Sequence, residues 1–105
     1  MSEKNTADEA AFIADLNATF PGCSARSLRQ WSGNPAYIGA VVGGEADVID
    51  GEPIAPYVFQ DSAEYDGWVH GAFSAWVSLR GWYVEVYEPG TLWVVPISRS
   101  MHPDA

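Results

Sequence analysis

The sequence predicts a small α+β domain in which two helices cover an antiparallel sheet of about four to five strands, in the approximate order α-β-β-(β)-α-β-β. Two observations lead to this fold class. Apolar residues recur at helical spacing in two separate stretches, whereas residues 82–97 are rich in the β-branched and aromatic residues typical of a hairpin. With 105 residues the chain suffices for one core, so we expect a single domain over 1–105, with frayed tails at 1–5 and 99–105.

The first helix is predicted to begin near Thr6. Thr6 and Glu9 have the spacing of a capping box, in which each side chain satisfies an unpaired main-chain donor. Pro21 and Gly22 end the pattern. One face carries apolar residues that must cover either the sheet or the second helix, namely Phe12, Ile13, Leu16 and Phe20.

The stretch from 23 to 31 is ambiguous, because its alternation favours a strand while Ser24 would cap a short helix. We favour the strand. A turn is expected at 32–35, followed by a clearer strand over 36–42.

A hairpin is expected around Asp50-Gly51, with strands over 46–49 and 53–59. The two prolines of the second strand cannot donate to a ladder, so this hairpin belongs at a sheet edge or in an irregular loop.

The second helix is predicted to begin near Ser62, with Asp61 as its cap and Glu64 completing a capping box, and to end at Arg80 and Gly81. Its core-facing arc contains Tyr65, Trp68, Val69, Ala72, Phe73, Trp76 and Leu79. The opposite arc holds small residues beside His70, namely Gly67, Gly71, Ser74 and Ser78, and is either exposed or packed against the first helix.

Residues 82–88 and 91–97 are predicted to form a hairpin with a turn at Pro89-Gly90. If Glu88 pairs with Thr91, the face toward the helix carries Trp82, Val84, Val86, Trp93, Val95 and Ile97. The other face then carries Tyr83, Glu85, Tyr87, Leu92 and Val94. A bulge near the turn would shift the register and exchange these faces.

The formal charge of −9 opposes binding to nucleic acid or to anionic lipid, and it favours a basic protein partner. Cys23 is the single cysteine, so no disulfide framework is expected and a reducing cytoplasm is the natural setting. The sequence contains neither an export signal nor an apolar run long enough to span a membrane.

The interval between Arg29 and Arg80 contains seven carboxylates and no Lys or Arg. We call the part that carries these carboxylates, residues 45–66, the acidic segment. Aromatic residues lie between its charges, and this combination favours binding to a basic protein groove, although it would equally serve only to keep the chain in solution. The predicted partner-binding residues are Glu45, Asp47, Asp50, Glu52, Tyr57, Asp61, Glu64, Tyr65 and Asp66.

We predict no catalytic residues, no cofactor and no metal site. The spacing of the carboxylates from Glu45 to Glu52 does not fit a calcium loop. Asp66 and His70 are one helical turn apart, which favours a surface pair over an acid-oriented base, since no nucleophile motif accompanies them. Most tryptophans are expected in the core, with Trp31 as the exception because its neighbours are polar.

The sequence therefore favours a non-enzymatic protein-interaction module whose acidic surface occupies a basic surface on a partner protein. In size, charge and lack of a catalytic signature, the chain is similar to the small acidic inhibitors of phages and mobile elements, such as anti-CRISPR or DNA-mimic proteins. One alternative is a small-ligand or enzyme module with an aromatic pocket, using Asp66 and His70 or the face of Tyr83, Glu85 and Tyr87. Another is a structural homodimer.

Overall fold

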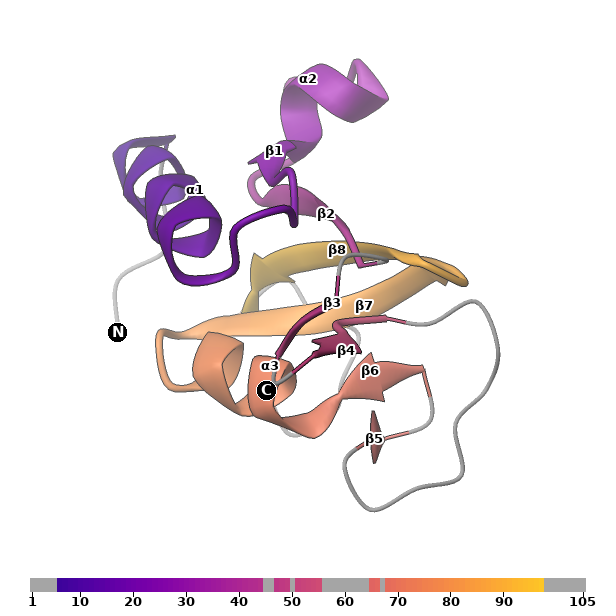
Figure 1. Ribbon diagram of the computed structural model, residues 1–105. Helices are drawn as coiled ribbons and strands as arrows, with labels where there is room; N and C mark the ends of the chain where they lie inside the picture. Colours follow the sequence, from indigo (N-terminus) through magenta and orange to yellow (C-terminus); the bar gives the residue numbers. More distant parts are fainter. Residues whose placement is uncertain (1–5, 45–46, 50, 56–64, 67, 98–105) are drawn as a thin grey trace.

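Figure 1 shows the computed structural model, which describes residues 6–44, 47–49, 51–55, 65–66 and 68–97. The elements in chain order are α1 (Thr6–Thr19), β1 (Arg26–Ser27), α2 (Leu28–Ser32), β2 (Ala40–Gly43), β3 (Asp47–Ile49), β4 (Glu52–Pro53), β5 (Tyr65–Asp66), β6 (Val69–His70), α3 (Gly71–Ser78), β7 (Trp82–Glu88) and β8 (Thr91–Pro96). The predicted α+β class is confirmed.

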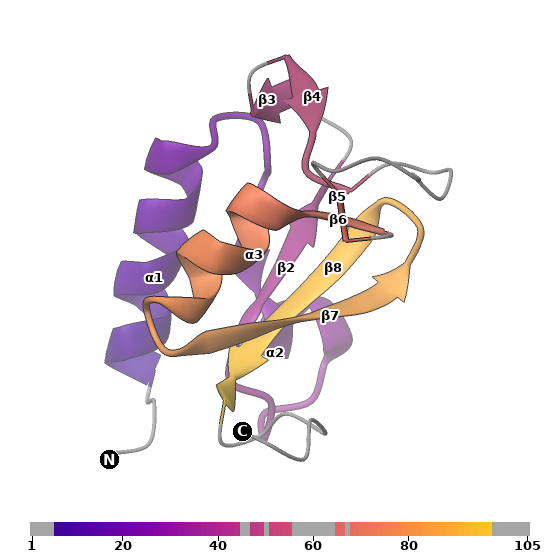
Figure 2. The ribbon, with the colours of Figure 1, turned by 90° about the horizontal axis from the view of Figure 1, so that it is seen from below.

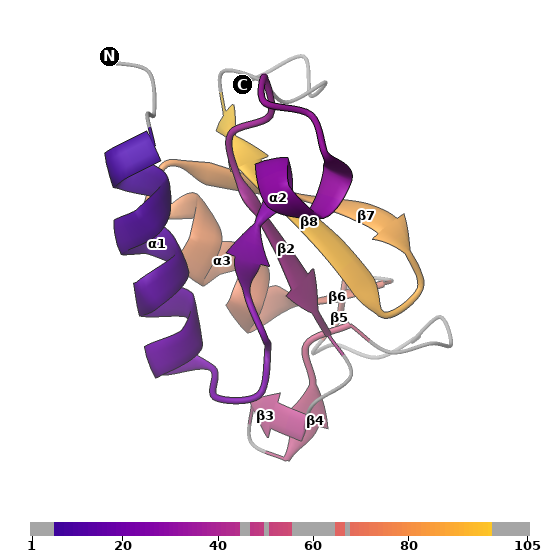
Figure 3. The ribbon, with the colours of Figure 1, turned by 90° about the horizontal axis from the view of Figure 1, so that it is seen from above.

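The main sheet has four antiparallel strands in the order β1-β2-β8-β7. Within the described ranges, β3 with β4 and β5 with β6 form two further short ladders, which lie apart from the main sheet (Figure 2). Helix α2 lies on one face of the main sheet and α3 on the other (Figures 1 and 3). The sheet is therefore covered on both faces.

The terminal hairpin forms over the predicted residues, and Glu88 pairs with Thr91 as expected. A bulge then leaves Tyr87 without a partner, so that Val86 pairs with Leu92 and Glu85 with Trp93. The bulge accommodates the Pro-Gly turn, whose twist does not match that of the strands. It also shifts the pairing of β8 with β7 by one residue.

This shift makes the predicted faces of β8 wrong. Leu92 and Val94 are buried in the main core, whereas Trp93 and Val95 lie on the α2 side. On β7 the prediction holds, because Trp82 faces the main core.

The main core lies between the sheet, α1 and α3. The predicted stripe of α1 is buried there, and the Phe12 ring stacks on Trp82 with centroids 4.5 Å apart. Phe20 meets Phe73 of α3 edge-on at 5.1 Å. Helix α1 therefore covers both the sheet and α3, which the sequence left open.

Helix α3 begins at Gly71, so the predicted start near Ser62 is wrong. Tyr65 pairs with His70 and Asp66 with Val69 in the β5-β6 ladder, which buries Val69 as effectively as a helix would. His70 is the N-cap, because its Nδ1 accepts a hydrogen bond from the Ala72 main-chain N–H at 3.2 Å. Asp61, Glu64 and Gly67 lie outside the described residues.

The predicted end of this helix is close to the observed one. Gly81 has φ 83° directly after the helical turn, and the Arg80 guanidinium donates to the Trp76 carbonyl oxygen at 2.9 Å. These contacts satisfy main-chain groups that the helix end leaves without partners.

Residues 23–31 contain both of the predicted alternatives. Arg26 and Ser27 pair with β2, and α2 follows at once with Ser27, not Ser24, as its N-cap. The next strand is shorter than predicted, since β2 starts at Ala40. The Asp50-Gly51 hairpin is present as the β3-β4 ladder, in which Ile49 pairs with Glu52, while residues 56–59 lie outside the described part.

Candidate functional site

The acidic segment is fixed to the sheet by main-chain hydrogen bonds. The N–H of Gly44 donates to the carbonyl of Gly90 in the hairpin turn, and the N–H of Ala55 donates to the carbonyl of Gly44, both at 2.8 Å. The N–H of His70 donates to the Ile54 carbonyl, also at 2.8 Å. A Cβ on Gly44 would lie 2.4 Å from that of Ala55, so this close approach requires glycine.

Of the predicted partner-binding residues, Glu52 and Tyr65 have described side chains. For Asp47 in β3 and Asp66 in β5, the structure describes the backbone alone. The remaining predicted residues lie outside the described ranges, namely Glu45, Asp50, Tyr57, Asp61 and Glu64.

The structure brings Glu52 and Tyr65 together through His70. The Tyr65 hydroxyl donates to the Pro53 carbonyl at 2.6 Å, and its ring packs against the imidazole of His70 with centroids 4.9 Å apart. On the imidazole, Nε2 lies 3.4 Å from a carboxylate oxygen of Glu52. The half-buried Glu52 and the Tyr65 ring therefore both contact the imidazole of His70.

His70 has a structural function that sequence reasoning missed. The predicted surface pair with Asp66 is wrong, because His70 is only 6% exposed and lies on a strand. Nδ1 of His70 accepts the N-cap hydrogen bond, and Nε2 at the other side of the ring lies toward Glu52. A histidine followed by Gly-Ala-Phe is a weak helix-start signal, so only the ladder register reveals this function.

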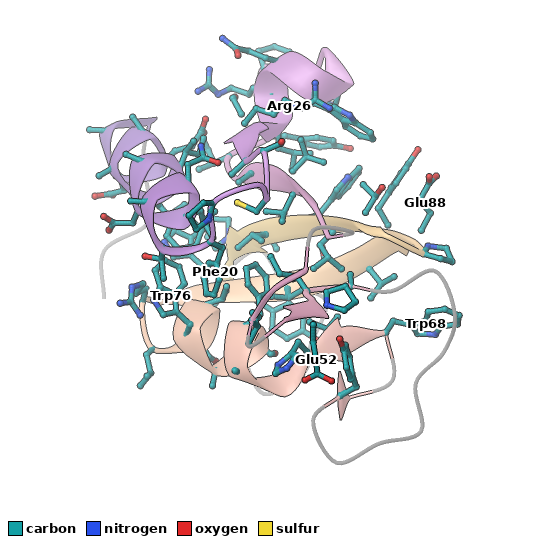
Figure 4. The ribbon with its side chains drawn as sticks, viewed as in Figure 1. Phe20, Arg26, Glu52, Trp68, Trp76 and Glu88 are labelled. Carbon is teal, nitrogen blue, oxygen red and sulfur yellow. The ribbon has the colours of Figure 1, made fainter. Side chains whose placement is uncertain are left out.

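The described arginines lie away from Glu52. Arg29 binds Glu9 of α1 at 2.8 Å, and the guanidinium of Arg80 lies 3.7 Å from the ring centre of Trp76 at the end of α3. Figure 4 shows Arg26 on the α2 side of the sheet and Glu52 on the α3 side. None of these three arginines neutralises the carboxylate of Glu52.

A second surface feature lies on the α2 side of the sheet, where four aromatic rings meet. Tyr87 stacks on Trp93 with centroids 5.1 Å apart and an interplanar angle of 9°, and Trp31 stands at 86° to Tyr87, also at 5.1 Å. The Tyr37 ring also contacts Trp93, with the two ring centroids 5.9 Å apart. We call Trp31, Tyr37, Tyr87 and Trp93 the aromatic cluster. Sequence analysis identified Trp31 and the outer face of β7, but it missed the cluster because Trp93 was placed on the opposite face.

A groove of about 390 Å³ lies beside the aromatic cluster, bordered by Arg26, Trp31, Val41, Tyr87 and Glu88. In a regular strand two consecutive residues point to opposite faces. The bulge at Tyr87 removes this alternation, so the Tyr87 ring and the Glu88 carboxylate both border the groove. Figure 4 shows Glu88 on the same side of the sheet as Arg26.

The part of the chain that the structure describes was compared with the needs of a metal site and of a reactive thiol. No set of three or more His, Cys, Asp or Glu side chains there is placed to hold a metal ion. Cys23 is buried against the main core, and this burial raises the pKa of its thiol. A thiol held in its protonated form is a poor nucleophile.

Comparison of the chain with known protein families, curated proteins and solved structures finds no match. Within the described ranges, no helix combines the length and the apolar character needed to cross a membrane. The candidate functional surfaces of the chain are therefore the acidic segment and the groove beside the aromatic cluster.

Proposed function

We propose that this chain is a non-enzymatic protein-interaction module whose acidic segment occupies a basic surface on a partner protein. The observation that carries the proposal is the separation of charges described above. Among the described arginines, Arg29 is bound by Glu9, Arg80 lies at the end of α3 and Arg26 lies across the sheet, so none of these three pairs with Glu52. A carboxylate beside an aromatic ring supplies both attraction and an apolar contact.

The overall charge supports the same proposal. At −9, the chain repels nucleic acid and anionic lipid, and it attracts basic proteins at a distance, with an association rate that falls as salt screens the field. A protein that covers a basic surface blocks what that surface would otherwise bind. Inhibition of a nucleic-acid-binding protein, as by anti-CRISPR or DNA-mimic proteins, is the form of this activity we propose, in a cytoplasmic setting.

The test begins with capture of a partner from the native host and its identification by mass spectrometry. Binding of the purified partner is then measured for Glu52→Lys and for Asp15→Lys, an exposed position on α1 that receives the same change of charge. We expect Glu52→Lys to weaken binding about tenfold, equivalent to about 1.4 kcal/mol, while Asp15→Lys has little effect. Binding should also weaken as salt is raised.

Two results would contradict the proposal. Equal effects of the two substitutions would show that only net charge matters and that the acidic segment is not the contact surface. Affinity that does not change with salt would show that charge does not drive the association.

A further inference from the structure

We propose that the groove beside the aromatic cluster binds an arginine side chain presented by a partner protein. This inference rests on the proposed function, because it names the chemistry by which a basic partner would be recognised at a second surface. Three features of the groove carry it: exposed rings in a fixed arrangement, a carboxylate beside them, and a floor that cannot accept a peptide as an extra strand.

The rings are exposed and are held in place from behind. Trp31 is 36% exposed and Tyr87 is 50% exposed, which is unusual for large aromatic side chains that contact each other. Tyr87 is supported by Trp93 on one face and by Trp31 at an angle of 86°. Binding would therefore not have to order these side chains, which lowers its entropic cost.

A guanidinium fits this arrangement because it is planar, weakly hydrated and stacks on aromatic faces. The same chain already contains such a contact, since the guanidinium of Arg80 lies 3.7 Å from the ring centre of Trp76. In the groove, the free surfaces of Trp31 and Tyr87 offer the equivalent position to an arginine from outside.

Glu88 supplies the matching charge. It borders the groove next to Tyr87, and within the described residues it forms no ion pair, nor does Arg26 on the facing wall. A guanidinium stacked on Tyr87 would lie in the same groove as this carboxylate, which can accept a charge-assisted hydrogen bond from it. The positive charge of Arg26 repels an incoming guanidinium, so replacing Arg26 should strengthen the binding of arginine. An anionic ligand would instead depend on Arg26.

The floor of the groove excludes strand addition. Strand β2 pairs with β8 along Ala40–Gly43, and on its other side it pairs with β1 and donates from the Gly43 N–H to the Cys23 carbonyl at 2.8 Å. A peptide lying over β2 therefore cannot pair with it as an extra strand, and it contacts this floor through its side chains.

The experiment uses the full chain and three hexapeptides with blocked ends, each carrying two identical residues separated by glycines: arginine, its uncharged isostere citrulline, or glutamate. Binding is followed by NMR through the indole N–H signal of Trp31, assigned with Trp31→Phe. We expect the arginine peptide to shift this signal saturably, with about tenfold weaker binding to Tyr87→Ala and to Glu88→Gln and severalfold tighter binding to Arg26→Gln. All three positions are exposed, so the variants should fold, which circular dichroism checks.

Binding of the citrulline peptide as tight as that of the arginine peptide, preference for glutamate, or indifference to Tyr87→Ala would each overturn the inference. The Glu52→Lys variant distinguishes a failure of this inference from a failure of the proposed function. If the arginine peptide binds this variant normally while the native partner does not, the groove and the acidic segment act independently. If the partner binds through the acidic segment but the arginine peptide leaves the Trp31 signal unchanged, the groove inference alone fails.

Discussion

Glu9 and Arg29 form an ion pair that joins α1 to α2, with the Arg29 Nη2 atom 2.8 Å from a carboxylate oxygen of Glu9. The other carboxylate oxygen accepts from the Gly39 main-chain N–H at 3.4 Å. Glu9 is 2% exposed, whereas the Arg29 side chain is 29% exposed. Removal of Arg29 would therefore leave a buried carboxylate, whereas removal of Glu9 would leave a guanidinium that water can partly reach.

We predict that Arg29→Met destabilises the protein by roughly 3–5 kcal/mol, because it leaves the Glu9 charge buried without a partner. Glu9→Gln should cost less, roughly 1–3 kcal/mol, since the exposed side of Arg29 can be hydrated and the amide oxygen still accepts from Gly39. Urea denaturation of both variants at neutral pH measures the difference. A larger loss for Glu9→Gln would contradict this account of the pair.

The register of the hairpin is tested by one residue of each strand, Leu92 in β8 and Tyr87 in β7. Leu92 is fully buried against α3, so Leu92→Lys should prevent folding, and Leu92→Ala should cost roughly 2–5 kcal/mol. Tyr87→Ala, at the bulge, should cost far less because its ring is half exposed. If Leu92→Lys folds normally, Leu92 faces solvent and the register expected without a bulge is the true one.

Gly43 and Gly44 provide a matched pair for the packing of the acidic segment on the sheet. A Cβ on Gly44 would meet the Ala55 main-chain nitrogen at 2.8 Å, whereas on Gly43 it would make an ordinary 3.5 Å contact with the Cys23 carbonyl oxygen. Gly44→Ala should therefore cost about 1–3 kcal/mol more than Gly43→Ala. Thermal unfolding of the two variants, which have the same composition, gives this difference directly.

Cys23 should react with a maleimide only when the protein unfolds. Its thiol is buried, and the Sγ atom lies 3.5 Å from Oδ1 of Asn17 and 3.6 Å from the Leu16 carbonyl oxygen. Burial raises the pKa of the thiol above its usual value of 9.0. The rate of labelling at neutral pH should thus follow the unfolding equilibrium in urea, and rapid labelling of the native protein would contradict the burial.

The same shift has a pH consequence with a defined sign. Because the folded pKa is higher than the unfolded one, the contribution of the thiol to stability is complete below the unfolded pKa. It is lost as pH rises toward the folded pKa, since the unfolded chain then releases its proton first. Cys23→Ala should flatten the decrease in stability above about pH 9, compared with the unsubstituted chain.

The sequence predicted the strands of the hairpin, the first helix and the α+β class, because these follow from local periodicity and turn residues. It left open whether a bulge near the turn shifts the register, because the bulge that forms at Tyr87 depends on the twist of the assembled sheet. It also extended the second helix through Val69, since burial of an apolar side chain at that position is compatible with a helix or a ladder.

The candidate sites, too, were predicted only where they follow from a local feature of the sequence. Composition was enough to identify the acidic segment, since a long interval without Lys or Arg is visible in the sequence alone. The contact of His70 with Glu52 and the meeting of Trp31 with Tyr87 and Trp93 join residues far apart in the chain, and the contact of His70 with Tyr65 follows from the pairing of β5 with β6. Those pairings exist only once strand register is fixed, so no local pattern encodes them.

The main-chain bonds that tie Gly44, Ile54 and Ala55 to the hairpin turn and to His70 involve no carboxylate. Replacing charges along this part of the chain would consequently leave its anchoring intact. The proposed contact surface and the bonds that anchor it thus use different chemical groups, so substitutions could alter the choice of partner without destabilising the fold.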